Sequence, residues 1–144
     1  MINKSRIIFI LVSIVSIGTL TQFIFNESHS KNPPVVKEPQ WDSPRTKELF
    51  SKACIDCHSN ETTWPRYSTV FPMSWLIESH VKEGREHFNV SMWGVQKKNK
   101  GKDAAEEVSE NEMPPFSYKL AHPEARLTDS EKEQLEIGLK KTFK

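Results

Sequence analysis

Two cysteines and a histidine stand within five consecutive residues, as Cys54, Cys57 and His58. Thiols three residues apart lie on the same side of a helical turn, so each can form a thioether with one of the two vinyl groups of a haem. The C-x-x-C-H spacing is the attachment signature of c-type haem, and an adjacent imidazole can coordinate the iron as proximal ligand. The motif therefore predicts one covalently attached haem c, with Cys54 and Cys57 binding the cofactor and His58 binding the metal.

Three other uses of the cysteine pair remain open. A redox dithiol of the thioredoxin type requires a parallel βαβ framework, which the hydrophobic pattern does not show. A zinc site requires two further ligands, and with no second cysteine pair these would come from His80, His87 and His122. A plain disulfide across so short a loop is the third use. We favour haem, because the chain carries the features of an exported protein.

The iron needs a second ligand unless one of its faces is open. The candidate side chains are those of Met73, Met92, Met113, His80, His87 and His122. Met113 precedes two prolines, which fix φ and limit the conformations of the loop, so its sulfur is predicted to bind the face opposite His58. The main rival is His80, on the predicted apolar face of its helix, and Met113 could instead only fill the core.

Large aromatic side chains follow the motif, at Trp64, Tyr67, Phe71 and Trp75. Aromatic rings can cover a porphyrin face, and the polar groups of Tyr and Trp can donate to a propionate. Ordinary packing explains any one of them equally well. Because few aliphatic residues lie nearby, Trp64 and Tyr67 are predicted to line the cofactor.

The N-terminal segment carries no charge from residue 7 to residue 25, with Lys4 and Arg6 before it and Glu27 after it. About 20 apolar residues span a bilayer as a helix, and flanking basic residues favour the cytoplasmic side. A cleaved signal peptide is the alternative, although no A-x-A site follows. We expect a single-pass anchor in the cytoplasmic membrane, with the rest of the chain facing the periplasm or the cell exterior.

The sequence divides into three parts. Residues 1–26 form the anchor or signal segment, and residues 27–40, which contain several Pro and Ser, form a flexible linker. Residues 41–144 are predicted to form an all-α, cytochrome c-like helical domain around one haem, because no segment alternates as a strand.

Helix starts are marked within this domain. Asp42-Ser43-Pro44 predicts one start, Pro72 a second, and the capping-box pattern from Thr128 to Glu131 a third. A weaker helix is predicted over residues 103–111. Residues 59–71 and 113–127 are predicted to be irregular.

Composition excludes several classes of protein. The 144 residues are 36% hydrophobic and 27% charged, which favours a folded domain over a disordered chain. The net charge of +1 argues against a nucleic-acid binder, which usually carries a basic face. Two cysteines are too few for a disulfide-rich scaffold.

The chain resembles the small haem-binding domain family of bacterial exported proteins, relatives of monohaem cytochromes c. The resemblance covers nearly all of residues 46–140 and depends on residues 54–60, 63–68, 84–85, 89–93, 113–115, 118, 122–123 and 127–128. It implies covalent haem c, an N-terminal export segment and an all-helical fold. It does not imply a substrate.

We therefore expect an electron carrier on the outer side of the cytoplasmic membrane. Its partners would be redox proteins, and its N-terminal helix would bind the membrane. We expect no binding to nucleic acid. The alternative is a peroxidase-like or gas-binding haem enzyme with an open distal position, or a haem-based sensor whose surface changes with redox state.

Overall fold

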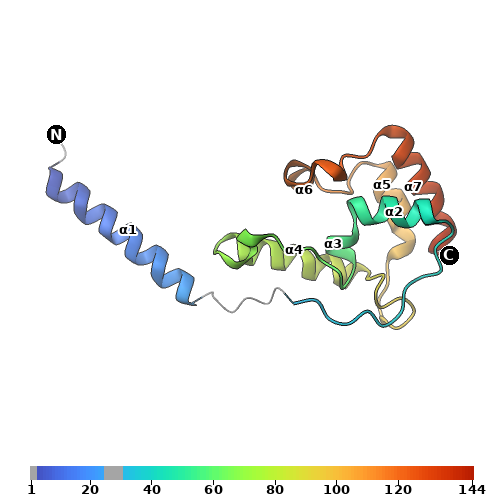
Figure 1. The fold of residues 1–144 in the computed structure, drawn as a ribbon, viewed down its shortest axis with the longest axis horizontal. Helices are drawn as coiled ribbons and strands as arrows, with labels where there is room; N and C mark the ends of the chain where they lie inside the picture. Colours follow the sequence, from blue (N-terminus) through green and yellow to red (C-terminus); the bar gives the residue numbers. More distant parts are fainter. Residues whose placement is uncertain (1–2, 25–30) are drawn as a thin grey trace. The chain divides into compact units, whose positions relative to one another are not determined.

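A computed structural model describes residues 3–24 and 31–144 of the chain. The secondary-structure elements within these residues are all helices, and none is a strand, which confirms the predicted all-α class (Figure 1). The α-helices are α1 (Lys4–Ile24), α2 (Pro44–Ala53), α3 (Ile55–His58), α4 (Met73–His87), α5 (Ala104–Ser109), α6 (Phe116–Ala121) and α7 (Asp129–Thr142). Three 3-10 turns accompany them, η1 (Arg66–Thr69), η2 (Gly101–Asp103) and η3 (Pro123–Ala125).

The chain forms two compact units. The first contains residues 1–31 and 64–79, and the second contains residues 32–63 and 80–144. These bounds differ from the three predicted parts, 1–26, 27–40 and 41–144, which stay predictions. Residues 25–30, at the predicted boundary between anchor and linker, lie outside the described residues.

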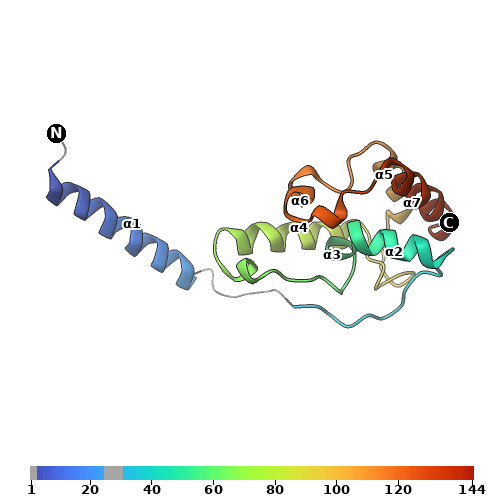
Figure 2. The ribbon, with the colours of Figure 1, turned by 45° about the horizontal axis from the view of Figure 1, so that its top comes forward.

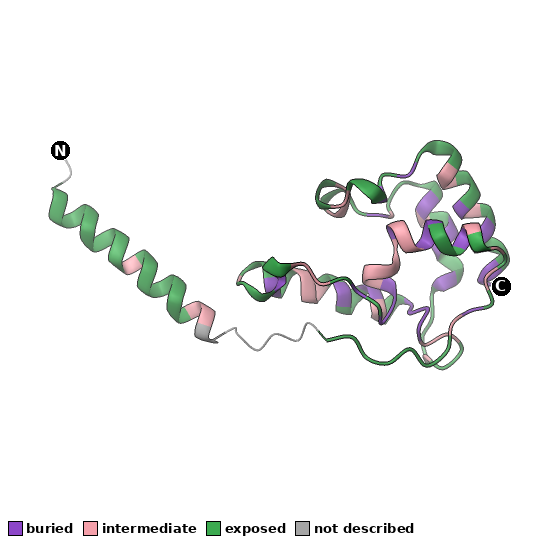
Figure 3. Ribbon diagram, in the orientation of Figure 1, coloured by how far each residue is buried: buried purple, intermediate pink, exposed green. Residues whose placement is uncertain are grey.

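Helix α1 of the first unit has the character expected for residues 1–26. Its segment Lys4–Gln22 is 19 residues long with a mean hydropathy of 1.6, so it is long and apolar enough to cross a membrane. A signal sequence meets the same criteria. The side chains of the segment are almost all exposed in the protein (Figure 3), as either role requires.

The second unit is built on three helices that pack side by side, α2, α5 and α7 (Figures 1 and 2). Aromatic rings fill the centre of the core around Phe143, whose ring centroid lies 4.4 Å from that of Trp93, 5.7 Å from that of Phe88 and 6.2 Å from that of Phe50. The aliphatic part of the core comes from Leu49, Val90, Val108, Leu127, Leu135 and Leu139. This core supports the residues of the motif, because Cys54 and Ile55 pack directly against it.

The helix starts that were predicted from capping residues in the sequence are confirmed for α2 and α7. Ser43 caps α2 by accepting a hydrogen bond from the Thr46 amide at 3.2 Å. Thr128 and Glu131 form a complete capping box at the start of α7. Each cap satisfies backbone donors that the first turn of a helix leaves free, so the helices begin where the sequence indicates.

Helix α6 was not predicted, because it lies within residues 113–127, which were expected to be irregular. It begins directly after Pro115. Proline has no amide hydrogen to donate and a φ close to the helical value, so it is tolerated at the start of a helix. The proline pair therefore precedes a short helix instead of excluding one.

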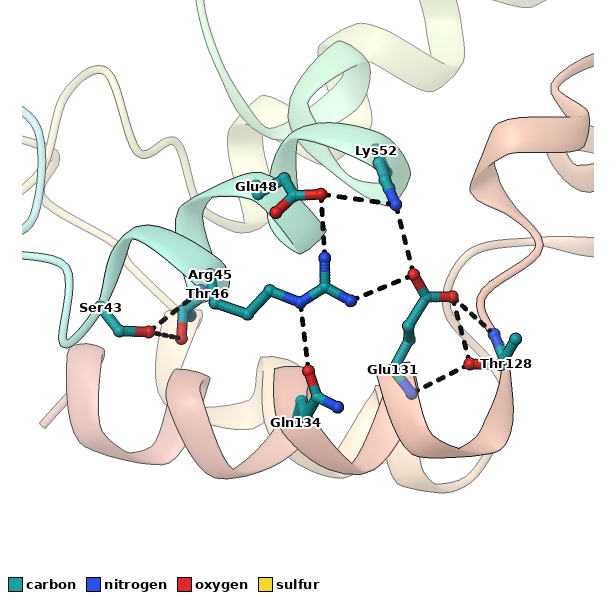
Figure 4. A network of polar contacts seen from close by, with 8 residues as sticks. All are labelled: Ser43, Arg45, Thr46, Glu48, Lys52, Thr128, Glu131 and Gln134. Atoms are coloured by element: carbon teal, nitrogen blue, oxygen red, sulfur yellow. Dashed lines mark hydrogen bonds and ion pairs between the residues drawn. The ribbon is translucent and has the colours of Figure 1, made fainter.

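Polar side chains join α2 to α7 (Figure 4). The guanidinium of Arg45 donates to Glu48 at 2.9 Å, to Glu131 at 3.3 Å and to Gln134 at 3.1 Å. The Lys52 ammonium lies 3.2 Å from the same Glu131 carboxylate. The contacts with Glu131 and Gln134 link the two helices at the surface of the unit.

The segment of residues 32–40 was predicted to belong to a flexible linker. It is extended and hydrogen-bonded within the second unit: the Val36 and Lys37 amides donate to the Ser91 carbonyl at 2.9 and 3.0 Å. The Trp93 amide donates back to the Lys37 carbonyl at 2.9 Å. The described part of the linker is thus held along the domain, while residues 27–30 lie outside the described residues.

Candidate haem-attachment site

The two cysteines lie at the junction of α2 and α3. The Cys54 amide caps α2 by donating to the Phe50 carbonyl at 2.8 Å, and the Cys54 carbonyl accepts from the His58 amide at 3.0 Å. Cys54 has a φ of −130°, outside the helical range, so the chain changes direction there. This break allows a new helical turn, Ile55–His58, to present the second cysteine and the histidine.

Both thiols are free and partly buried. Burial raises the pKa of Cys54 to about 12 and that of Cys57 to about 11, and the Asp56 carboxylate adds to the effect at Cys57. A dithiol that exchanges electrons relies on a thiol with a lowered pKa. The environment of Cys54 and Cys57 therefore does not favour the thioredoxin-type alternative.

The ring of His58 is held in one orientation. It is only 8% exposed, stacks on Phe88 with ring centroids 4.1 Å apart, and places Nδ1 3.2 Å from the Phe88 carbonyl. Since a carbonyl can only accept, Nδ1 carries the proton. Burial lowers the pKa of His58 to about 4, so the ring is neutral and Nε2 keeps its lone pair. A neutral imidazole with Nδ1 bound to a carbonyl is the usual form of a metal-ligating histidine.

Helix α4 contacts the attachment turn at a glycine. A Cβ atom added to Gly84 would lie 2.6 Å from the Cys57 carbonyl oxygen and 2.9 Å from the Cys57 Cβ. Such distances are not tolerated, so the close contact requires glycine at this position. Next to it, Arg85 donates from Nε to the Ser59 carbonyl at 2.7 Å. The turn is thus fixed from two sides, by the core and by α4.

A buried polar layer follows the motif. The Asn60 backbone amide donates to the Ser91 hydroxyl at 2.9 Å. The side-chain amide of Asn89 donates to the side-chain oxygen of Asn60 at 2.7 Å. The Asn60 side chain also donates to the Pro34 carbonyl at 2.8 Å. Buried polar groups need such partners, and here they join the attachment turn to residues far along the chain.

These residues fit a covalent haem. The cysteine pair stands on a turn packed against the core, and the histidine beside it is neutral. Two thiols and an adjacent imidazole are the donor set that haem c requires. Within residues 3–24 and 31–144, no three side chains of His, Cys, Asp or Glu gather as metal ligands. The described residues therefore offer no zinc site.

The candidates for the second iron ligand have different surroundings. Met113 is partly buried and packs against the core of the second unit, and its amide donates to the Glu107 carbonyl at 3.1 Å. His80 and His87 are exposed on α4, and Met73 is exposed as well. The second unit contains Cys54, His58 and Met113, and it also contains His80 and His87. Ligation by Met113 stays a prediction.

Trp64 and Tyr67 belong to the first unit. Trp64 is partly buried and Tyr67 is exposed. Their predicted contact with the cofactor stays a prediction.

Two features of the site were missed in the sequence. Phe116 and Leu120 lie one turn apart on α6 and are 73% and 60% exposed, so they form an exposed apolar face on the helix that follows Met113. Their four-residue spacing after a proline pair could have indicated them. The second feature is a hydrogen bond of 2.7 Å from the Tyr118 hydroxyl to Asp56, 62 residues apart. No local signal could have indicated that pair.

Comparison with known proteins gives one match. The model of the haem-binding domain family matches residues 14–141. No curated protein and no solved structure matches the chain.

Proposed function

Because the chain belongs to the haem-binding domain family, we propose that it is an electron carrier with one covalent haem c, held on the outer side of the cytoplasmic membrane. The observation that carries the proposal is the geometry of His58. Its Nδ1 donates to the Phe88 carbonyl while its ring is buried and neutral, directly after the cysteine pair. With its tautomer fixed in this way, His58 would bind the haem iron through its other ring nitrogen, Nε2.

Four residues would hold the haem in this proposal. Cys54 and Cys57 hold the macrocycle through thioethers, His58 is the proximal ligand and Met113 is the distal ligand. When bound, the haem supplies one-electron chemistry, and a His/Met ligand pair raises its reduction potential. Trp64 and Tyr67 stay predicted cofactor-binding residues. Redox proteins of the same compartment are the proposed partners.

The test is an optical spectrum with a redox titration of protein matured in an export-competent host. An electron carrier should be six-coordinate and low-spin in both oxidation states, with a weak near-infrared sulfur-to-iron band in the ferric form. It should titrate reversibly with one electron. A high-spin ferric iron that binds peroxide or a small gas directly would replace the carrier with the enzyme or sensor alternative.

The location is proposed from α1. Its charge-free segment follows Lys4 and Arg6, which favours a cytoplasmic N-terminus. Full-length protein should stay with membranes in high salt and leave them only with detergent. A native N-terminus trimmed near residues 18–20 would instead identify a cleaved signal peptide.

A further inference from the structure

The middle of the attachment motif makes a contact that haem attachment does not require. The two oxygens of the Asp56 carboxylate accept one hydrogen bond each, from the Tyr118 hydroxyl at 2.7 Å and from the Thr63 amide at 2.7 Å. An ionised carboxylate offers only acceptors, and such charge-assisted bonds are stronger than neutral ones. Asp56 and Tyr118 are both partly buried, so water competes less for this contact than it does at the surface.

Tyr118 lies on α6, a short helix that does not pack into the core. None of the six residues of α6 is buried, so core packing does not fix its position. Among the described residues, the tyrosine ring stacks on His122, with ring centroids 4.0 Å apart, and Arg126 donates to the Lys119 carbonyl at 2.8 Å. Both partners follow α6 directly in the chain, so neither joins it to the attachment turn. The directed bond to Asp56 therefore has a large share in fixing α6 against the attachment turn.

Helix α6 begins three residues after Met113, with Pro114 and Pro115 between them. On its other side, the Met113 amide donates to the Glu107 carbonyl of α5 at 3.1 Å. Met113 is thus held between two fixed points, α5 before it and the Tyr118–Asp56 bond after it. The prolines between Met113 and Tyr118 stiffen the connection.

We propose that Tyr118 is a positioning residue for the distal ligand: its bond to Asp56 fixes the segment that carries Met113 against the turn that carries His58. The inference rests on the proposed function, because it needs Met113 to bind the iron. It also assigns a role to the residue between the two cysteines. Asp56 joins the proximal and distal sides of the site.

The experiment measures how readily added imidazole displaces the distal ligand of the full-length ferric protein. The loss of the sulfur-to-iron band reports the displacement. Tyr118→Phe keeps the ring and removes only the hydroxyl. It should bind imidazole about 10-fold more tightly than the wild type, the effect of losing one hydrogen bond to a charged group. Ser117→Ala, which removes an exposed hydroxyl from the same helix, should bind it as the wild type does.

A double-mutant cycle separates positioning from general loss of structure. Asp56→Ala should act like Tyr118→Phe, and combining them should add little, because both remove the same bond. Asp56→Asn should retain much of the wild-type behaviour, since its amide oxygen still accepts. Glu131→Gln, which weakens the distant contact between α2 and α7, should leave imidazole binding unchanged.

Two results would overturn the inference. If Tyr118→Phe binds imidazole as weakly as the wild type, or if the effects of the two single variants simply add, the Tyr118–Asp56 bond does not position Met113. If the wild type lacks the sulfur band altogether, the proposed ligand set is wrong and the inference falls with it. The wild-type spectrum thus distinguishes the two failures.

Discussion

The attachment turn with His58 and the proposed distal side with Met113 and α6 are built differently. His58 is 8% exposed and stands on a turn that packs against both the core and α4, whereas Phe116 on the distal side is 73% exposed. The proximal side is held by close packing and buried hydrogen bonds. The distal side is held by a few directed contacts, chiefly the Tyr118–Asp56 bond. In the proposed function, the attachment point is therefore fixed and the position of the distal ligand is easier to change.

The difference has a physical cause. Close packing responds sharply to added or lost volume, so the turn from Cys54 to His58 should tolerate little change in its neighbours. Helix α6 has no buried residue, so we infer that its position depends more on single hydrogen bonds. Changes on the proximal side should therefore affect attachment and folding, and changes on the distal side should affect ligation and potential.

The largest expected effect is on attachment itself. Replacing both Cys54 and Cys57 with Ser should abolish covalent binding, because no thiol remains to form a thioether. Haem should then extract fully into acidified acetone, and the mass spectrum should show only the polypeptide. The wild-type protein should keep its haem under the same conditions. Free extraction of haem from the wild type would contradict covalent attachment.

The next effect tests the close packing of α4 on the attachment turn. Alanine would ordinarily stabilise a helix interior relative to glycine by about 1 kcal/mol. In Gly84→Ala the new methyl group overlaps the Cys57 backbone, so we expect a net loss of about 1–2 kcal/mol in the free energy of unfolding. Urea titration of the haem-loaded protein measures it.

The matched control for this packing test is Glu83→Ala, an exposed neighbour on the same helix, which should change little. A Gly84→Ala protein as stable as the wild type would show that α4 can move away from the turn at no cost.

On the distal side, Met113→Ala should change ligation more than folding. The ferric protein should lose its sulfur-to-iron band and bind cyanide or imidazole readily, and its reduction potential should fall, because a Met ligand raises it. His80→Ala should leave the band and the potential nearly unchanged, since His80 is exposed. If the wild type lacks the band and His80→Ala makes the iron high-spin, the site has two histidine ligands.

The smallest effect concerns the contact between α2 and α7, away from both sides of the site. The Thr128 amide, followed by the Lys52 ammonium, holds the pKa of Glu131 at about 2. A carboxylate whose pKa is lowered by folding stabilises the folded protein at pH values above its ordinary pKa of 4.5. This stabilisation is lost as the pH falls toward 2. Glu131→Gln should therefore be slightly less stable than the wild type at pH 7.

The difference between Glu131→Gln and the wild type should shrink below pH 4.5 and disappear near pH 2. Urea titrations at several pH values measure it, and the haem spectrum should not change between the two proteins. A constant difference across this range would assign the effect to packing instead of charge.

Prediction from the sequence succeeded where the signal was local. The starts of α2 and α7 followed from Ser43 and from the Thr128–Glu131 pair, because a cap involves residues only three positions apart. Helix α6 was missed because residues 113–127 were expected to be irregular, although the prolines only precede the helix. The described part of the linker was expected to be flexible but is hydrogen-bonded to Ser91, whose position along the chain gives no indication of that contact.

The sequence by itself determined the attachment motif, the apolar N-terminal helix and the all-helical class, since each depends on the type and spacing of neighbouring residues. Only the tertiary structure decided that Gly84 lies against Cys57, that Phe88 orients His58, and that Tyr118 reaches Asp56. These contacts join residues 27 to 62 positions apart. They depend on how helices pack on a shared core, and the spacing of residues along the chain does not contain that information.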